Sequence, residues 1–219
     1  IIALIILNIL QGYDLAALDP NGWERLHIEA EATRLAYRDR AALVADPDAV
    51  EVPSAHLLSP AYADGLRARI SRDGAMASLP RAGEAEHRDT VYLTVVDSER
   101  NAISFINSTF HAFGSGICAP KSGVMLQNRG SSFVLDDDHA NRIEPGKRPM
   151  HTIIPGMLAE GERAIMPFGV MGGHYQATGH AHFLTNFIDF GMDPQEALDA
   201  PRAFHYESEL TVEIGISQA

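Results

Sequence analysis

Cysteine and positive charge are both scarce in this chain. Its single cysteine, Cys118, excludes an internal disulfide bond and leaves the compartment open between periplasmic or secreted and cytoplasmic. Lysine and arginine together number 17 against 29 acidic residues, so the formal net charge is -12. Nucleic acids are bound by basic surfaces, and this charge balance therefore excludes nucleic acid as an expected partner.

Long apolar runs and metal-binding motifs are also missing. The opening stretch IIALIILNIL is too short to span a bilayer, and no basic leader precedes it, so no membrane partner is expected. We interpret this stretch as a buried helix whose beginning lies upstream, within a longer protein. The 10 histidines form neither an H-E-x-x-H motif nor a Cys/His cluster, so neither a metal nor another cofactor is expected.

What is present is the composition of a globular protein that mixes helices and strands, with 46% hydrophobic residues, 18 glycines and 12 prolines. The first third of the chain reads as helical. Helices are expected over residues 1–12, within residues 19–50 with Asp46-Pro47 as the stop, and over residues 59–70 with Ser59 as the N-cap. Residues 72–89 are small, charged and rich in Gly and Pro, which is typical of a mobile linker.

Strands dominate the middle of the chain. Residues 90–97 and 102–110 are β-branched runs separated by SERN, which predicts a hairpin with Asn101 in the left-handed turn position. Residues 123–128, 131–136 and 210–214 are further strand candidates, and the turn in 144–158 should lead into another. Residues 163–191 read as strand, glycine turn and helix ending at Gly191, and 193–203 as a short helix capped by Asp193. This order predicts a layered α+β sandwich.

Thr90 stands where a charged loop, Glu84 to Asp89, gives way to the first strand. A threonine hydroxyl is a weak nucleophile unless a base takes its proton, and one solution makes the threonine N-terminal so that its own amine is that base. A cut between Asp89 and Thr90 would achieve this. The alternative is an ordinary strand threonine after an ordinary loop, and these residues alone leave it open.

Other segments suit the same chemistry. Ser108 lies across the expected hairpin from Thr90, and backbone N–H groups at Gly172-Gly173 could form an oxyanion hole at the start of a helix. FGSG at 113–116 allows close backbone approach, and the turn at 144–152 carries Lys147 and Arg148. Each has a simpler explanation as a capping serine, a tight turn or a solvated turn, and separately they decide little.

Taken together and in this order, the segments resemble the γ-glutamyltransferase (γ-glutamyl transpeptidase) family of N-terminal-nucleophile hydrolases, in its acylase-like branch. The matching stretches are LNILQGYDLAAL, EATRLAYRDRAALVADPD, TVYLTVVDSERNAIS, FGSGI, EPGKRP, GGH and NFIDFGMDPQEALDAPR. The resemblance implies a portion of an αββα four-layer sandwich made by autocatalytic cleavage of one precursor. Residues 1–89 would be the end of the large subunit with its linker, and 90–219 most of the small catalytic subunit, together forming one domain.

The resemblance also implies roles for single residues. Thr90 matches the nucleophile released by cleavage after Asp89, Ser108 the hydroxyl residue bonded to it, and Gly172 and Gly173 the oxyanion glycines.

Five positions expected to contact the substrate depart from the transpeptidase pattern. Transpeptidases place an asparagine where this chain has Phe110, and a substrate-binding aspartate where it has Ser132; the others are Arg129, His151 and Thr152. A carboxylate facing an ammonium forms a strong charge-assisted pair. Without it, the pocket should suit an acyl group that lacks a free α-ammonium, such as a dicarboxylic glutaryl group.

The sequence therefore favours an amide hydrolase or acyl transferase of the glutathione hydrolase type, with a small γ-glutamyl or other acyl-amide substrate. An acylase of the cephalosporin or glutaryl kind is the alternative within this class. A non-enzymatic alternative is a family member that stays uncleaved and acts as a binding protein. Whether the protein forms a homodimer is left open.

Overall fold

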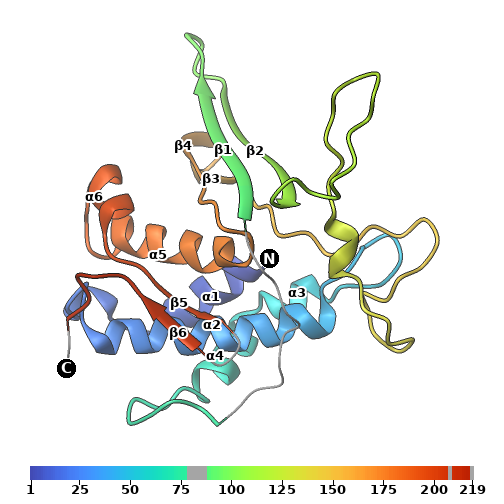
Figure 1. The fold of residues 1–219 in the computed structure, drawn as a ribbon. Coiled ribbons are helices and arrows are strands. Elements are labelled where there is room, and N and C mark those ends of the chain that lie inside the picture. The colour runs from blue at the N-terminus through green and yellow to red at the C-terminus, as the bar shows by residue number, and fades with distance from the viewer. Residues whose placement is uncertain (78–87, 207–208, 218–219) are drawn as a thin grey trace. The chain divides into compact units, whose positions relative to one another are not determined.

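The computed structural model describes residues 1–77, 88–206 and 209–217, which form two compact units (Figure 1). The first unit consists of Ile1–Val44, Glu51–Glu84 and Ala177–Ala219, and the second of Ala45–Val50 and Ala85–Gln176. Each unit therefore contains chain from both sides of the Asp89–Thr90 bond.

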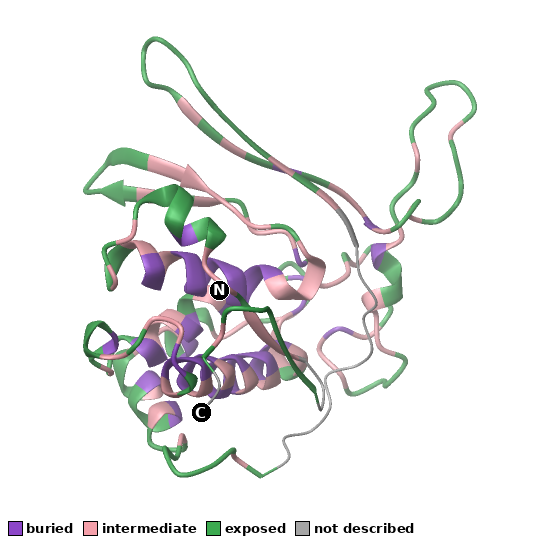
Figure 2. Cartoon of the chain, turned by 60° about the vertical axis from the view of Figure 1, so that its left-hand side comes forward, coloured by how far each residue is buried: buried purple, intermediate pink, exposed green. Residues whose placement is uncertain are grey.

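Helices make up most of the first unit, and α2 (Trp23–Leu43) is its longest. Helices α1 and α4 and strand β5 all contact α2, and Figure 2 shows the buried residues gathered along the helices of this unit. The elements of the unit are α1 (Ile2–Leu10), η1 (Leu15–Ala17), α2, α3 (Ser54–Leu57), α4 (Pro60–Arg67), α5 (Gln176–Ile188), α6 (Pro194–Asp199), β5 (Ala203–Tyr206) and β6 (Glu209–Val212).

The helix ends follow local sequence rules. The Ser59 side chain accepts a hydrogen bond from the Tyr62 N–H at 3.3 Å, and a proline follows at the first turn of α4. Asp193 and Glu196 form a reciprocal capping box at the start of α6. The expected helices, including these two caps, are confirmed.

A buried polar network joins α2 to α5 inside the first unit. Arg25 is fully buried and donates to Glu29 Oε1 at 3.1 Å and to Thr185 Oγ1 at 3.0 Å. His182 Nδ1 lies 2.9 Å from Glu29 Oε2, and it must carry a hydrogen because an ionised carboxylate only accepts. Burial alone raises the pKa of an acid, but His182, Arg25 and the Thr185 hydroxyl together lower the pKa of Glu29 to about 2.

The second unit is built from two strand pairs and long loops. Strands β1 (Arg88–Val96) and β2 (Ala102–His111) form an antiparallel hairpin, and β3 (Gly156–Glu160) pairs with β4 (Arg163–Phe168). The unit also contains two 3-10 turns, η2 (Arg129–Ser132) and η3 (Gly173–Tyr175). With β5–β6 in the first unit, the described strands pair in three separate two-stranded sheets.

Several sequence expectations are wrong in detail. Strand β1 begins at Arg88, not Thr90, because its first residues already pair with the end of β2. The left-handed turn residue of the hairpin is Arg100, with φ of 65°, because the Asn101 side chain and N–H are held by Asp97.

Other errors concern whole elements. Residues 123–128 and 131–136 form no strand; only isolated bridges involve them, at Met125 and Val134. Around 131 the chain instead closes the turn η2, where the Ser132 hydroxyl donates to the Arg129 carbonyl. Helix α6 ends at Asp199 rather than at residue 203, because Pro201 disfavours helical conformation in the residue before it.

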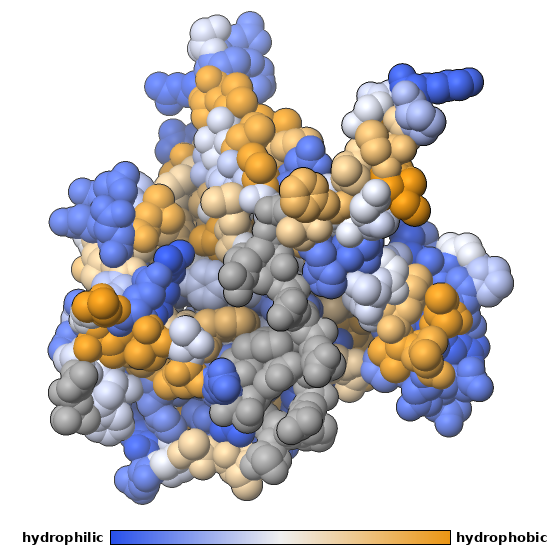
Figure 3. Space-filling model, in the orientation of Figure 1, coloured by the Kyte–Doolittle hydropathy of each residue, from blue (hydrophilic) through white to orange (hydrophobic). Residues whose placement is uncertain are grey.

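The β1–β2 hairpin exposes apolar side chains, which Figure 3 shows in orange along its length. Apolar residues on both faces of a strand are typical of sheets covered on both sides, as in a layered sandwich. The exposed residues are Val91, Leu93, Val95, Val96, Ile103 and Phe105.

Membrane-spanning helices and metal clusters are both absent from the described residues. No helix among them is long and apolar enough to cross a membrane. Within the same residues, no group of three or more His, Cys, Asp or Glu side chains could hold a metal ion.

The buried network predicts an acid-sensitive stability. Glu29→Gln leaves the Arg25 charge buried beside a neutral group, and we expect a loss of about 3–5 kcal/mol in unfolding free energy at pH 7. Because the native pKa of Glu29 is lowered to about 2 from 4.5, its carboxylate stabilises the fold above pH 4.5, and this contribution is lost as the pH falls toward 2. Urea unfolding at pH 7 and pH 4 measures both effects.

The half-exposed Glu24 in the same helix supplies the control. Glu24→Gln should change the unfolding free energy by less than about 1 kcal/mol. Equal effects of the two substitutions would show that the network contributes no special stability.

Candidate active site

The register of the β1–β2 hairpin brings Thr90 opposite Ser108. Asp89 pairs with Phe110 and Thr90 with Ser108, so Thr109 is an extra residue and the ladder shifts at the Asp89–Thr90 bond. The Thr90 hydroxyl donates to Ser108 Oγ at 3.1 Å, and Ser108 Oγ also accepts the Phe110 N–H at 3.0 Å. The contact expected between these two hydroxyls is therefore present.

Backbone strain lies beside the bond expected to be cut. Phe110 has φ of 78°, a conformation that a bulky side chain rarely adopts. Such strain persists only where surrounding contacts enforce it, and it clusters at functional sites. The bulge and this residue together distort the strand pairing at the Asp89–Thr90 bond.

The glycine turn after β4 approaches strand β1. Ser104 on β2 donates to the Phe168 carbonyl at 3.2 Å and bonds the Tyr92 hydroxyl at 3.1 Å. A Cβ added at Gly169 would lie 2.5 Å from the Tyr92 ring, so only glycine permits this approach. The following turn η3 lies against β1.

Gly172 and Gly173 form the turn itself. Their φ values are 119° and 57°, both in the region that favours glycine. Among the described residues, neither N–H group donates a hydrogen bond to a protein acceptor. Two backbone donors are thus available next to strand β1.

A cation and aromatic rings surround Phe110, whose side chain is buried. The Arg129 guanidinium carbon lies 5.0 Å from the centre of the Phe110 ring, and Arg129 Nη1 donates to Thr152 Oγ1 at 3.0 Å. The His111 ring stacks on Phe110 at 4.6 Å, and the His174 ring meets it edge-on at 6.3 Å. Phe110, Arg129, Thr152 and His174 come from four different segments of the second unit.

The remaining predicted contact residues, Ser132 and His151, lie beside Arg129. Ser132 Oγ donates to the carbonyls of Arg129 at 2.8 Å and Met150 at 3.1 Å, so its hydrogen is committed to the backbone. His151 is exposed, yet partial burial of its ring and the charge of Arg129 lower its pKa. An aspartate at position 132 would face two carbonyl oxygens.

Three residues of the site, His174, His111 and Asn128, were not predicted from the sequence. His174 directly follows the glycine pair, a position that could have drawn attention to it. Asn128 accepts the His111 N–H at 3.0 Å and bonds the His111 ring at 2.8 Å, a cross-loop contact that no sequence pattern announces.

Two predicted segments act away from Thr90. In FGSG, Gly114 packs against the Leu126 carbonyl, where a Cβ would clash, and the Ser115 hydroxyl donates to that carbonyl at 2.9 Å. This turn therefore closes the 114–126 loop. The basic pair at 147–148 is likewise engaged: Lys147 Nζ donates to the Ala140 carbonyl at 2.7 Å and pairs with Glu144 at 3.1 Å.

Arg148 is held by a buried carboxylate. Its backbone N–H donates to Asp46 Oδ2 at 2.9 Å, its Nη2 to Asp46 Oδ1 at 2.6 Å, and Nη2 also meets the exposed Asp48 at 2.5 Å. The Arg148 side chain and N–H lower the pKa of Asp46 well below its usual range. Arg148 thus links residues 45–50 to the 144–152 turn.

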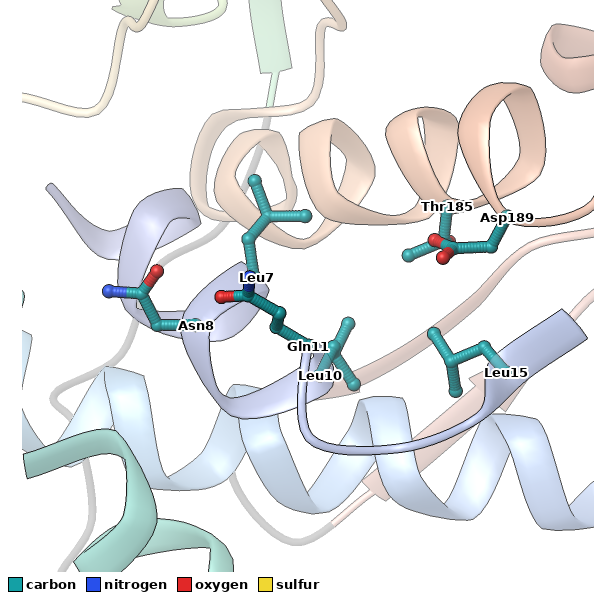
Figure 4. A pocket seen from close by; sticks show the side chains of 7 residues that line it. All are labelled: Leu7, Asn8, Leu10, Gln11, Leu15, Thr185 and Asp189. Atoms are coloured by element: carbon teal, nitrogen blue, oxygen red, sulfur yellow. The ribbon is translucent and has the colours of Figure 1, made fainter. Parts of the chain in front are cut away.

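A separate hollow lies in the first unit between α1 and α5 (Figure 4). It measures about 210 Å³, and burial raises the pKa of Asp189, whose carboxylate points into it. The lining residues are Leu7, Asn8, Leu10, Gln11, Leu15, Thr185 and Asp189.

Comparison with known proteins identifies the fold. The family model for gamma-glutamyltranspeptidase matches residues 1–219. The chain belongs to the γ-glutamyltranspeptidase family. It is 38% identical over 199 residues to the glutathione hydrolase-like YwrD proenzyme of Bacillus subtilis, covering 91% of this chain and 37% of that protein. It is 37% identical over 202 residues to the oxamate amidohydrolase proenzyme of Klebsiella pneumoniae, covering 92% of this chain and 37% of that protein.

A solved structure gives the same answer. The cephalosporin acylase from Bacillus halodurans matches with a TM-score of 0.85 and 40% identity, over 99% of this chain and 39% of that one. The expected fold class, α+β and a portion of an N-terminal-nucleophile hydrolase sandwich, is confirmed. The chain spans little more than a third of the length of the relatives that it matches.

The Asp46–Arg148 contact yields a prediction for the stability of this chain. Asp46→Asn removes the charge that holds the guanidinium and its N–H, so we expect a lower Tm at pH 7. Because the native pKa of Asp46 is lowered, its contribution is present above pH 3.8 and is lost only as the pH falls below that value. Thermal unfolding followed by circular dichroism is the measurement.

Asp48→Asn is the matched control, since Asp48 meets the same Nη2 but is 80% exposed. Exposed ion pairs contribute little, and its Tm should stay unchanged. If Asp48→Asn lowered the Tm as much as Asp46→Asn, the buried contact would stabilise the fold no more than the exposed one.

Proposed function

We propose that this chain carries the nucleophile of an amide hydrolase or acyl transferase, activated by autocatalytic cleavage between Asp89 and Thr90. One observation carries the proposal. The Thr90 hydroxyl is hydrogen-bonded to Ser108 at 3.1 Å on a strand that the Gly172–Gly173 turn also contacts, and both glycine N–H groups lack acceptors among the described residues. A nucleophile and oxyanion donors on adjacent elements are what acyl transfer needs.

The chemistry follows from these groups. After cleavage, the α-amine of Thr90 takes the proton of its own hydroxyl while Oγ1 attacks the amide carbonyl. The carbonyl oxygen becomes an oxyanion that the N–H groups of Gly172 and Gly173 stabilise. The C–N bond then breaks, the departing amine takes the proton, and an ester to Thr90 remains. Water hydrolyses this ester, or an amine accepts the acyl group. Ser108 orients the hydroxyl.

Cleavage would leave two interlocked pieces, with residues 1–89 belonging to the large subunit and residues 90–219 to the small subunit. Residues 45–50 belong to the second unit, and residues 177–219 to the first. The Asp46–Arg148 contact would then join the two subunits. Neither piece could leave without dismantling both units, so we infer that the subunits stay associated.

The names of the relatives support amides of small acids as the substrate class: they are glutathione hydrolases, an oxamate amidohydrolase and acylases. A glutathione hydrolase type of activity on γ-glutamyl amides is the primary proposal. An acylase type is the alternative, favoured by Phe110 and Arg129, which bring an apolar wall and a positive charge where transpeptidases bind an ammonium. An uncleaved, non-catalytic protein is the third candidate, and cleavage of the precursor separates it from the others.

Cleavage is tested by Thr90→Ala in the full-length precursor. This change removes the hydroxyl that must attack the preceding carbonyl, so we expect one uncut and inactive polypeptide, while Thr90→Ser cuts slowly. Denaturing gels and intact mass show the result. Efficient cleavage at Asp89–Thr90 in the alanine variant, or none in the wild type, would refute self-processing.

The oxyanion role is tested by comparing the two glycines. An added Cβ at Gly172 would lie 3.3 Å from the Tyr175 Cβ, at a φ of 119° that L-residues avoid, whereas Gly173 has open space and a φ of 57°. Gly172→Ala should therefore displace the donors and lower kcat by about 10²–10³. Gly173→Ala should have a smaller effect, because its conformation costs only about 1–2 kcal/mol.

Both variants are assayed after gel-verified processing, so that kcat reports the chemical step. A normal kcat for fully processed Gly172→Ala would contradict the assignment. A change confined to KM would point to substrate binding instead.

A further inference from the structure

Arg129 is a buried cation, and one edge of its guanidinium has no hydrogen-bond partner among the described residues. Its side chain is 3% exposed, and no ion pair joins it to a carboxylate among the described residues. One guanidinium nitrogen, Nη1, donates to Thr152, while Nη2 is closed to solvent and has no partner among those same residues. Burial also lowers the pKa of the guanidinium. A buried guanidinium without a negative partner is energetically costly, and a bound anion would compensate its charge.

Two other arginines of the chain show how a carboxylate compensates a guanidinium. Buried Arg25 is matched by Glu29, and Arg148 is matched by Asp46. Packing alone would explain the alkyl stem of Arg129 and its position over the Phe110 ring, but not the retention of an unpaired charged edge. A planar guanidinium fits a carboxylate with two parallel hydrogen bonds.

The free edge lies in the same cluster as the proposed nucleophile. The Phe110 ring contacts both Arg129 and His174, and His174 follows the Gly172–Gly173 pair. The Phe110 N–H donates to Ser108, which also accepts the Thr90 hydroxyl. Phe110 thus connects the cation to the nucleophile.

The described groups beside Arg129 do not suit an ammonium. Ser132 donates its hydrogen to two carbonyls, and the exposed His151 lies near enough for Arg129 to lower its pKa. Because Nη2 is closed to solvent in this structure, an anion reaches it when the side chains that cover it move.

We propose that Arg129 binds a carboxylate on the acyl group of the substrate, so that the preferred substrates are monoamides of dicarboxylic acids. The inference rests on the proposed function for the chemical step but assigns the specificity residue and the substrate class. Arg129 contacts the acyl group and takes no role in proton transfer.

The test uses the processed full-length enzyme and two readouts. The first is hydrolysis of glutaryl p-nitroanilide against valeryl p-nitroanilide, which has a methyl group in place of the carboxylate. Arg129→Met should lower kcat/KM for the glutaryl substrate by about 10- to 100-fold and change the valeryl value less than about threefold. Arg129→Lys keeps the positive charge but cannot form two parallel hydrogen bonds to a carboxylate. Its kcat/KM for the glutaryl substrate should lie between those of the wild type and Arg129→Met.

The second readout is binding, by calorimetry, of oxalate, malonate, succinate and glutarate, each against its neutral diamide. The wild type should bind at least one dicarboxylate at least tenfold more tightly than its diamide, and Arg129→Met should lose this preference. A folded Arg129→Lys variant with unchanged melting keeps the result interpretable if the methionine variant unfolds.

The outcomes separate the two proposals. Dicarboxylate binding that depends on Arg129, without cleavage of any anilide, sinks the proposed function and leaves the anion site standing. Cleavage of both anilides with ratios that Arg129→Met and Arg129→Lys leave unchanged overturns the anion site and leaves the function standing. Absence of dicarboxylate binding by the wild type also overturns the anion site.

Discussion

The pairing of Thr90 with Ser108 across the β1–β2 hairpin is the constraint on which the candidate site depends. Side chains alternate between the faces of a strand, so a slip of one residue would turn the Ser108 hydroxyl away from Thr90. The extra residue at Thr109 lets Phe110 pair with Asp89 while Ser108 pairs with Thr90. It also accompanies the positive φ of Phe110, the residue whose ring meets Arg129 and His174. The bulge at Thr109 thus positions Ser108 beside Thr90 and Phe110 beside Arg129.

Three arginines illustrate how charge is used in this chain. Arg25 is buried, and it donates to Glu29 and Thr185, which stabilises the packing of α2 on α5. Arg148 is compensated by Asp46 and fixes a loop. Arg129 is as buried as Arg25, but its only described hydrogen-bond partner through the guanidinium is the neutral Thr152. Because Arg25 and Arg148 both meet carboxylates, the contrast with Arg129 is informative.

The sequence predicts the elements with strong local signals and fails where tertiary contacts decide. Ser59 and Asp193 were readable as caps because capping depends on neighbouring residues. Residues 131–136 look like a strand by composition, yet the Ser132 hydroxyl closes a 3-10 turn against the Arg129 and Met150 carbonyls. Position 108 was readable from hairpin spacing, but the bulge beside it was not, since alternation alone gives no sign of an extra residue.

The same limit applies to the substrate contacts. The resemblance to the family drew attention to Arg129, Ser132 and Thr152, but only the structure distinguishes their states. Ser132 is occupied by the backbone, Thr152 holds Nη1 of Arg129, and Nη2 alone keeps binding capacity. The replacement of an aspartate by Ser132 is therefore only half of the change in charge. The other half is a guanidinium whose cost is offset when a ligand brings the missing negative charge. At the proposed anion site, an acyl group with its own carboxylate would supply that charge at the moment of binding, so recognition and charge compensation would be a single event.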